Sequence, residues 1–175
     1  MATVTVTSAF PAGRGGDAVA LVFEYMAATQ AETGRPVPSA IAELPAVLRR
    51  ECSSLHDVYR PPGVFLIADL GGRPAGCAGL AALPGERAAE VRRLYVRPAH
   101  RGNGVARTLM SHAHHHAARH GMTGLVLDVL PARTAALSFY RRLGYTETGP
   151  FQAESPLPMV YLERAVTRSD ILSGH

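Results

Sequence analysis

The sequence predicts one α/β domain of the α+β kind, with a mixed central sheet of about seven strands and four helices. Three observations support this fold class. Short apolar or alternating segments recur along the chain between glycine and proline turns, as strands do. Longer segments with apolar residues at helical spacing lie between them. A length of 175 residues, with 47% hydrophobic and 18% charged residues, suits a single domain with an apolar core.

The N-terminal third is expected to form one strand and two helices. Residues 3–7 alternate valine with threonine, which is typical of a half-buried strand. Apolar residues at helical spacing run over 17–32, and Asp17 is placed to cap that helix. Ser39 is expected to cap a second helical segment, in which Pro45 introduces a first turn or a kink. This segment carries one apolar stripe, made of Ile41, Leu44, Val47 and Leu48.

The rest of the chain is expected to alternate strands and helices. The expected elements are strands at 64–70, 74–83 and 90–96, a helix at 103–120, a strand at 125–130, a helix at 133–142, and strands at 146–151 and 159–163. Gly71-Gly72 is expected to form a hairpin turn, and Gly121 to end the long helix. Residues 1–175 are thus one domain with a core at 3–164 and a flexible polar tail at 165–175.

Composition narrows the classes of partner. The chain has 18 basic and 14 acidic residues, a mild excess that favours an anionic ligand. The arginine pairs are scattered, so no nucleic-acid partner is expected. No apolar run reaches about 20 residues, and the N-terminus does not resemble a signal peptide, so we expect a cytoplasmic protein without a membrane partner. Cys52 and Cys77 form no C-x-x-C pair and are expected to be reduced and structural.

The most informative segment is residues 90–106, EVRRLYVRPAHRGNGVA. It predicts a strand, a glycine-rich turn and a helix start, an order that turns free backbone N–H groups toward a phosphate. Its R-x-x-G-x-A spacing, entered from E-V-x-x-L-Y-V, resembles the acyl-CoA pyrophosphate loop of the GNAT acetyltransferases. The alternative is an ordinary strand–helix turn that needs glycine.

The resemblance covers residues 3–164 and implies the GNAT fold, in which the two middle strands, 90–96 and 125–130, splay apart. The pantetheine arm of acetyl-CoA then lies in the gap, and a backbone N–H near Val96 polarises the thioester carbonyl. The alternative is that these strands are only sheet core, and the two interpretations are compatible. The implied cofactor-binding residues are Leu94, Tyr95, Val96, Arg101, Gly102, Asn103, Gly104, Val105 and Ala106.

Tyr140 is the candidate general acid. Residues 140–145 have the spacing Y-x-x-x-G-Y, which is similar to the C-terminal signature of the family. The resemblance implies that the Tyr140 hydroxyl lies near the CoA sulfur and protonates the departing thiolate. The alternative is a helix tyrosine that packs on the sheet.

Glu90 is the candidate general base. An amine is protonated at neutral pH and must lose a proton before it attacks. Period-2 alternation predicts that the side chains of Glu90, Arg92, Leu94 and Val96 share one face of the strand. The alternative for Glu90 is a salt bridge to a nearby arginine.

The sequence departs from the family pattern at Arg133. Many members carry asparagine seven residues before the tyrosine, where it contacts the CoA arm. The expected cofactor contact passes either to Arg133, through a CoA phosphate, or to the backbone near Ala132.

The acceptor site is expected to involve the first two helices and the loop 151–158. Glu24, Tyr25 and Phe151 are the candidate substrate-binding residues, and Glu32, His56, Asp57 and Tyr59 are further candidates to hold a cationic amine. The alternative for each is a surface or capping role. Phe151-Gln152, followed by Pro156 and Pro158, would form a rim over the acceptor.

The histidines of the long helix suggest zinc, because His112, His116 and His120 recur every four residues. The predicted buried stripe is Val105, Leu109, Ala113 and Ala117, which leaves the histidines on its flank or facing outward. No carboxylate lies among them, so no metal is expected.

These features together predict an N-acetyltransferase that uses acetyl-CoA as cosubstrate. The acceptor is a primary amine of a small molecule or peptide, which attacks directly in a ternary complex because neither cysteine falls in the cofactor motifs. The alternative is a non-catalytic acyl-CoA sensor or partner module with the same fold. A homodimer is common in the family.

Overall fold

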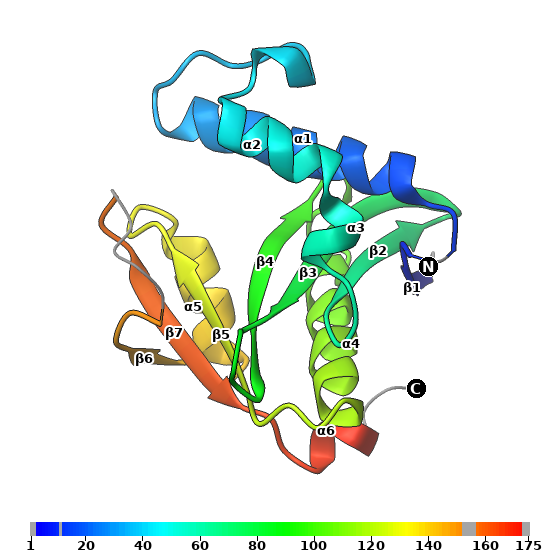
Figure 1. Ribbon diagram of the computed structural model, residues 1–175, viewed down its shortest axis with the longest axis vertical. Helices are drawn as coiled ribbons and strands as arrows, with labels where there is room; N and C mark the ends of the chain where they lie inside the picture. Colours follow the sequence, from blue (N-terminus) through cyan, green and yellow to red (C-terminus); the bar gives the residue numbers. More distant parts are fainter. Residues whose placement is uncertain (1–2, 11, 152–156, 173–175) are drawn as a thin grey trace.

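Seven strands form one mixed sheet in the order β1-β2-β3-β4-β5-β7-β6 (Figure 1). They come from a computed structural model that describes residues 3–10, 12–151 and 157–172. β4 and β5 are parallel, and the other neighbouring strands are antiparallel. The strands are β1 (Val4–Ser8), β2 (Val64–Leu70), β3 (Arg73–Ala82), β4 (Ala88–Val96), β5 (Gly124–Val129), β6 (Thr146–Thr148) and β7 (Val160–Ala165).

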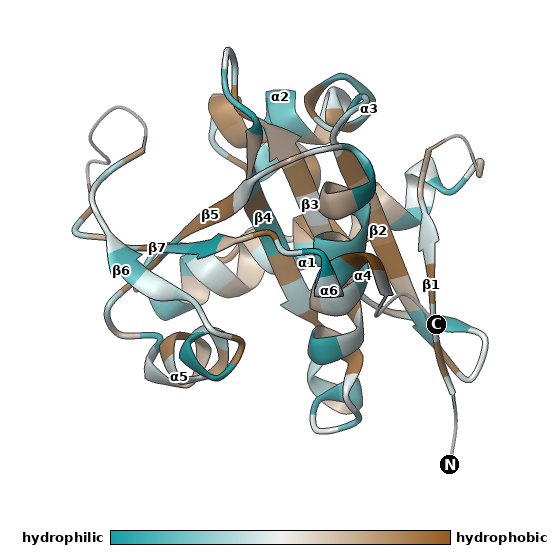
Figure 2. Ribbon diagram, turned by 90° about the horizontal axis from the view of Figure 1, so that it is seen from below, coloured by the Kyte–Doolittle hydropathy of each residue, from teal (hydrophilic) through white to brown (hydrophobic). Residues whose placement is uncertain are grey.

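Helices cover both faces of this sheet (Figures 1 and 2). One face, the α1–α2 face, carries α1 (Gly15–Glu32), α2 (Ala46–Ser53) and α3 (Leu55–Val58). The other, the α4–α5 face, carries α4 (Val105–Arg119) and α5 (Thr134–Arg142). The predicted order of strands and main helices is confirmed, with α6 (Ser169–Leu172) and two 3-10 turns, Ile41–Glu43 and Pro98–His100, added.

Each face has its own apolar cluster. Leu109 and Met110 of α4 pack on the α4–α5 face against Leu125 and Leu127 of β5. Leu21 of α1 packs with other side chains on the α1–α2 face, among them Phe65, Ile67, Cys77 and Tyr59. Both cysteines are buried free thiols, and burial raises the pKa of each. No helix in the described ranges is long and apolar enough to cross a membrane.

The sheet forks between its two parallel strands. β4 and β5 pair only from Ala88 to Glu90, opposite Gly124 to Val126. Beyond Glu90 the strands diverge, as Figure 1 shows, while β5 stays paired with β7 along its whole length. The splayed middle strands that the family resemblance implied are therefore present.

β4 contains a bulge immediately beyond the base of the fork. Tyr95 pairs with Cys77, whereas Arg92 pairs with Gly79, so β4 has one more residue than β3 in this interval. Arg93 has a φ of 56° there, in the left-handed region.

The bulge corrects the prediction that four alternating side chains of β4 share one face. Glu90 lies opposite Ala81, which belongs to the apolar cluster on the α1–α2 face. Leu94 and Val96, in contrast, pack in the cluster on the α4–α5 face. The extra residue reverses the alternation, so the carboxylate of Glu90 and the apolar side chains beyond the bulge lie on opposite faces.

The structure also corrects two helix starts. α1 begins at Gly15, and Asp17 lies in its first turn, where it accepts a hydrogen bond from Arg14 instead of capping the helix. Pro45 divides the expected second helix into a 3-10 turn and α2. The predicted apolar stripe is therefore wrong: of its four residues only Leu44 is fully buried, and Val47 is 67% exposed.

The expected flexible tail is packed over its described part. α6 lies against α4, and Asp170 is buried. Its carboxylate accepts hydrogen bonds from Arg164 and from the backbone and hydroxyl of Thr167. Such a capping network is not visible as apolar periodicity, which explains why the sequence did not predict it.

Candidate functional site

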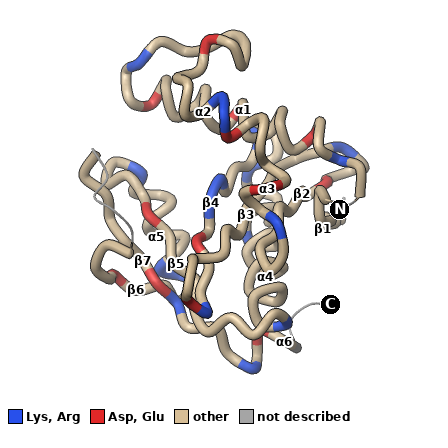
Figure 3. Tube along the Cα trace, in the orientation of Figure 1, with Lys and Arg blue, Asp and Glu red and all other residues tan. Residues whose placement is uncertain are grey.

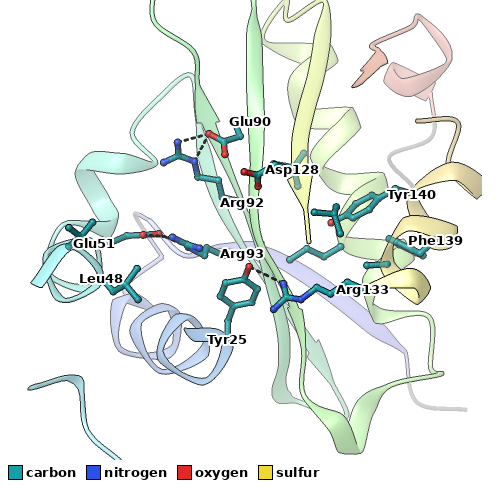
Figure 4. Close-up of a pocket in the computed structure, with 15 residues that line it drawn as sticks. Tyr25, Leu48, Glu51, Glu90, Arg92, Arg93, Asp128, Arg133, Phe139 and Tyr140 are labelled. Carbon is teal, nitrogen blue, oxygen red and sulfur yellow. Dashed lines mark hydrogen bonds and ion pairs between the residues drawn. The ribbon is translucent and has the colours of Figure 1, made fainter. Parts of the chain in front are cut away.

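A cleft of about 410 Å³ opens where β4 and β5 separate. Figure 4 shows side chains from α1, α2, the two strands and α5 converging on it. Its lining residues are Tyr25, Val47, Leu48, Glu51, Glu90, Val91, Arg92, Arg93, Leu94, Asp128, Val129, Arg133, Ala136, Phe139 and Tyr140. Figure 3 shows basic and acidic segments of the backbone trace on both sides of the gap between β4 and β5.

The glycine-rich loop connects the end of β4 to α4. Gly102 and Gly104 both have a φ of +79°, and a Cβ added at either would meet nothing within 4 Å, so their backbone is open to a ligand. The Asn103 amide donates to the carbonyls of His100 and Arg101, at 3.3 and 3.2 Å. Arg101 Nε donates to the Val96 carbonyl at 3.2 Å. These bonds hold the loop in shape without using its glycine N–H groups.

The start of α4 supplies free donors beside this loop. No side chain in the described residues caps the helix, and its first backbone bond runs from the N–H of Thr108 to the carbonyl of Gly104. The N–H groups of Val105, Ala106 and Arg107 precede that bond and point out of the helix end. Together with the helix dipole they can bind an anion such as a pyrophosphate.

Tyr140 reaches the cleft from α5. Its side chain is 7% exposed, and Figure 4 shows its hydroxyl directed toward the gap between the strands. Its ring lies edge-on to Phe139 and Tyr145, at centroid distances of 5.4 and 5.6 Å. Burial raises the pKa of Tyr140, so the phenol stays protonated at neutral pH and can donate a proton.

Glu90 is held in an ion pair with Arg92. Arg92 Nε donates to its carboxylate at 2.6 Å, and a second guanidinium nitrogen lies against the same oxygen. Burial raises the pKa of Glu90, while Arg92 opposes that rise. The salt bridge that was the alternative for Glu90 is therefore present.

Asp128 lies across the fork from this pair. Leu127 and Val129, its neighbours on β5, are buried in the cluster on the α4–α5 face, so Asp128 points to the opposite side. Figure 4 shows it between the two strands. Burial raises the pKa of Asp128, while Arg92 and Arg93 oppose that rise, and within the described residues its carboxylate forms no ion pair.

A second buried ion pair connects β4 to α2. Arg93 donates to both carboxylate oxygens of Glu51, at 2.7 and 2.5 Å, and these side chains are 22% and 13% exposed. The Arg93 guanidinium also lies 5.3 Å from the ring centre of Tyr25. The bulge makes this arrangement possible, because it turns Arg93 toward the α1–α2 face next to Arg92.

Arg133 bridges the cleft from α5 to α1. Its guanidinium donates to Glu32 at 2.7 Å, to the Thr29 hydroxyl at 2.7 Å and to the Tyr25 hydroxyl at 3.3 Å. These contacts hold the side chain against α1, and the expected contact of Arg133 with a CoA phosphate stays a prediction.

The other acceptor candidates differ in position. Tyr25 lines the cleft. Glu24 instead accepts hydrogen bonds from Arg97, at 2.7 to 3.2 Å. Phe151 packs edge-on against Tyr161 at 5.6 Å and does not line the cleft. Of the other residues of the predicted rim, Pro158 is exposed, and Gln152 and Pro156 fall outside the described residues.

The histidines of α4 have separate partners. The predicted buried stripe of this helix is confirmed, and His114 is buried as well. Both of its ring nitrogens have partners there: Arg164 donates to Nδ1 at 2.5 Å, and Nε2 lies 2.9 Å from the Tyr145 hydroxyl. Burial and Arg164 lower the pKa of His114 to about 4. His116 Nε2 lies 2.9 Å from the carbonyl of Pro62.

Sequence reasoning missed Asp128, Glu51 and Arg93 as parts of the site. Asp128 carried a signal, since it is the only charged residue in the apolar run LVLDVL. The pair of Glu51 with Arg93 carried none, because 42 residues separate them and only the bulge brings them together.

Comparison with known proteins agrees with this geometry. Residues 28–145 match the Acetyltransferase (GNAT) family. An IAA acetyltransferase of Azospirillum brasilense is 28% identical over 111 residues, which cover 63% of this chain and 72% of that protein. An uncharacterized N-acetyltransferase of Schizosaccharomyces pombe is 32% identical over 108 residues, 61% of this chain and 66% of that protein.

Solved structures show the same fold. A GNAT acetyltransferase of Staphylococcus aureus Mu50 matches with a TM-score of 0.74 at 12% identity, covering 94% of this chain and 100% of that one. YncA of Salmonella typhimurium, solved with its cofactor acetyl-CoA, matches with a TM-score of 0.67 at 18% identity over 94% and 95% of the two chains. Since the family match spans most of the chain and includes the fork and the loop, the chain belongs to the GNAT family and is an acetyl-CoA-dependent N-acetyltransferase.

Proposed function

We propose that this enzyme transfers the acetyl group of acetyl-CoA to a primary amine of a small molecule or peptide, by direct attack in a ternary complex. The observation that carries this proposal is the fork: β4 leaves β5 at Glu90, and the glycine-rich loop stands at the far end of β4. A long ligand with a phosphate at one end and a thioester at the other fits this arrangement.

The cofactor end of the site is made of backbone. The N–H groups of residues 105–107 and the open glycines at 102 and 104 would hold the pyrophosphate, with Arg101 beside them. The edge of β4 over Leu94, Tyr95 and Val96 would bond the pantetheine arm, since β5 does not pair with it there. A backbone N–H of this edge would stabilise the oxyanion.

The leaving group needs a proton, and we assign its donation to Tyr140. Its hydroxyl is protonated at neutral pH and directed into the gap. Neither thiol competes as a nucleophile, because Cys52 and Cys77 are buried on the α1–α2 face and burial raises the pKa of both. Direct attack by the amine therefore suits the site better than an acetyl-enzyme.

The proposal is tested by acetyl-CoA turnover against a panel of amines and peptides, with release of free thiol as the signal. All 18 basic residues are arginine, so no lysine of this chain contributes to the signal. The double variant Arg101→Ala, Gly104→Glu serves as the blank. Acetyl-CoA bound by calorimetry but never consumed would favour the non-catalytic sensor instead.

Tyr140→Phe sharpens the choice between enzyme and sensor. We expect kcat to fall by about ten- to a hundredfold at neutral pH, with acetyl-CoA affinity kept, because only the proton donor is removed. The matched control is Tyr161→Phe, a tyrosine on β7 that packs against Phe151 outside the cleft. Equal kcat in Tyr140→Phe and the wild type would remove Tyr140 from the mechanism.

A further inference from the structure

The position of Asp128 is set by the fork. Glu90 and Val126 are the last register partners of β4 and β5. The next side chains on that face are Arg92 on β4 and Asp128 on β5, so both stand one step into the open part of the cleft. Arg92 bends back to Glu90, which leaves Asp128 on the other wall without that partner.

The charges of the cleft balance except at this residue. Each arginine in the lining has a carboxylate of its own: Arg92 has Glu90, Arg93 has Glu51 and Arg133 has Glu32. Asp128 is the remaining charged group of the lining, half-buried and free of ion pairs within the described residues. Arg92 and Arg93 lie close enough to lower its pKa, but each is bound to another carboxylate, which leaves Asp128 as the carboxylate that a cationic ligand can pair with.

The wall contributed by α2 has a different chemistry. Val47 is 67% exposed and lines the cleft together with Leu48. An exposed valine at the mouth of a polar cleft loses contact with water when an apolar group covers it. The cleft thus offers one negative charge at the fork and an apolar surface nearer its mouth.

We propose that Asp128, rather than Glu90, receives the ammonium group of the acceptor and takes its proton, and that the acceptor has one positive charge on an otherwise uncharged, largely apolar body. This inference rests on the proposed transfer to an amine. It adds the base of the reaction and the class of the acceptor.

The transfer removes two protons from the ammonium nitrogen and adds one to the sulfur. The ammonium gives one proton to the Asp128 carboxylate, and the nitrogen lone pair forms the C–N bond with the thioester carbon. The C–S bond breaks with its electron pair on sulfur, and the thiolate takes the proton of Tyr140. The nitrogen loses its second proton, which returns through water to the Tyr140 oxygen, and Asp128 releases its proton to solvent.

The first arm of the test compares kcat/KM after removal of the Asp128 carboxylate with kcat/KM after removal of the Glu90 carboxylate. Asp128→Asn is expected to lower kcat/KM for an apolar monoamine about a hundredfold or more at neutral pH, while acetyl-CoA affinity measured by calorimetry stays within about threefold. The matched control is the double variant Glu90→Gln, Arg92→Gln, which removes the ion pair without changing the net charge. We expect this control to lose less than about tenfold.

The pH profile separates a base from a merely structural residue. The loss in Asp128→Asn should shrink at alkaline pH, because a larger fraction of the amine is then already neutral. The charged and titratable groups that line the cleft with Asp128 are Glu90, Arg92, Arg93, Glu51, Tyr25, Arg133 and Tyr140. With so many titratable groups nearby, a limb of the kcat/KM pH profile is assigned to Asp128 only if it disappears in Asp128→Asn.

The second arm tests the acceptor class with phenethylamine, phenylalanine and 1,5-diaminopentane. Phenylalanine adds a carboxylate to the first compound, and the diamine has a second ammonium and no ring. We expect kcat/KM for phenethylamine to exceed both by at least about tenfold. A preference for the zwitterion or the diamine, or near-normal kcat/KM in Asp128→Asn, would overturn the inference and leave the proposed function standing. Failure of every amine and peptide to react would overturn both.

Discussion

The two faces of the sheet contribute to the site in different ways. On the α4–α5 face the proposed cofactor end is made of backbone, since two glycines with a φ of +79° and a helix start without a side-chain cap in the described residues present N–H groups. On the α1–α2 face the cleft is lined by side chains, the ion pairs of Arg92 with Glu90 and of Arg93 with Glu51 around the proposed acceptor residue Asp128. A backbone site leaves a motif in the sequence, whereas a side-chain site depends on contacts between distant segments.

The largest effect is expected from a side chain introduced into the glycine-rich loop, where the proposed cofactor site is made of backbone. We expect Gly104→Val to weaken acetyl-CoA binding about a hundredfold, which corresponds to about 2.8 kcal/mol, because its side chain would occupy the space of the phosphate and strain a positive φ. Gly85→Val is the matched control, with a φ of +74° and the same open surroundings in the turn before β4. Calorimetry should show the loss only for Gly104→Val; equal affinities would mean that the loop does not bind the cofactor.

The second prediction removes one charge from the ion pairs on the α1–α2 face and measures their contribution to stability. Glu51→Gln leaves Arg93 without its counter-charge on the α1–α2 face, and we expect the free energy of unfolding to fall by about 2 kcal/mol. The control is Glu147→Gln, whose pair with Arg141 is exposed by 62% and 54%, with an expected change within about 0.5 kcal/mol. Urea unfolding gives both values. Similar values for the two variants would show that the pair on α2 is worth no more than a surface pair.

A third prediction concerns pH and the interior of the α4–α5 face. The pKa of His114 is about 4 in the folded protein and near 6.5 when unfolded, so the unfolded chain binds the proton first as pH falls. The stabilisation is full above about pH 6.5 and is lost as pH falls toward about pH 4. Between pH 7 and pH 5 we expect the wild type to lose about 1 to 2 kcal/mol more than His114→Gln does. Urea unfolding at the two pH values measures these losses. Equal losses in the wild type and in His114→Gln would contradict a neutral buried imidazole.

The fold was largely predictable, because its strands and long helices carry their own periodicity. The strand at 64–70 is predicted with the bounds that β2 has, and α4 and α5 agree within two residues at each end. β6 is an exception: it ends at Thr148, three residues before the predicted end.

The site was predictable in part. The loop and Tyr140 follow spacings within one short segment each. Arg133 could not be placed from the sequence, since its partner Glu32 is 101 residues away. The bulge at Arg93 was equally hidden, because an arginine at a φ of 56° has no marker in the sequence, and it changes the face of every later side chain on β4.

The fork also leaves the sheet open along one seam. On one side lie β1 to β4 and on the other β5 to β7; three residue pairs between β4 and β5, the packing of α4 on β5 and the bond from Arg164 to His114 join the two sides at the base, and Arg133 joins them at α1. The amides along the open edges of both strands have no strand partner, so hydrogen exchange there reports on occupancy. A ligand that bonds both edges completes the sheet across the gap, and the exchange of these amides then slows.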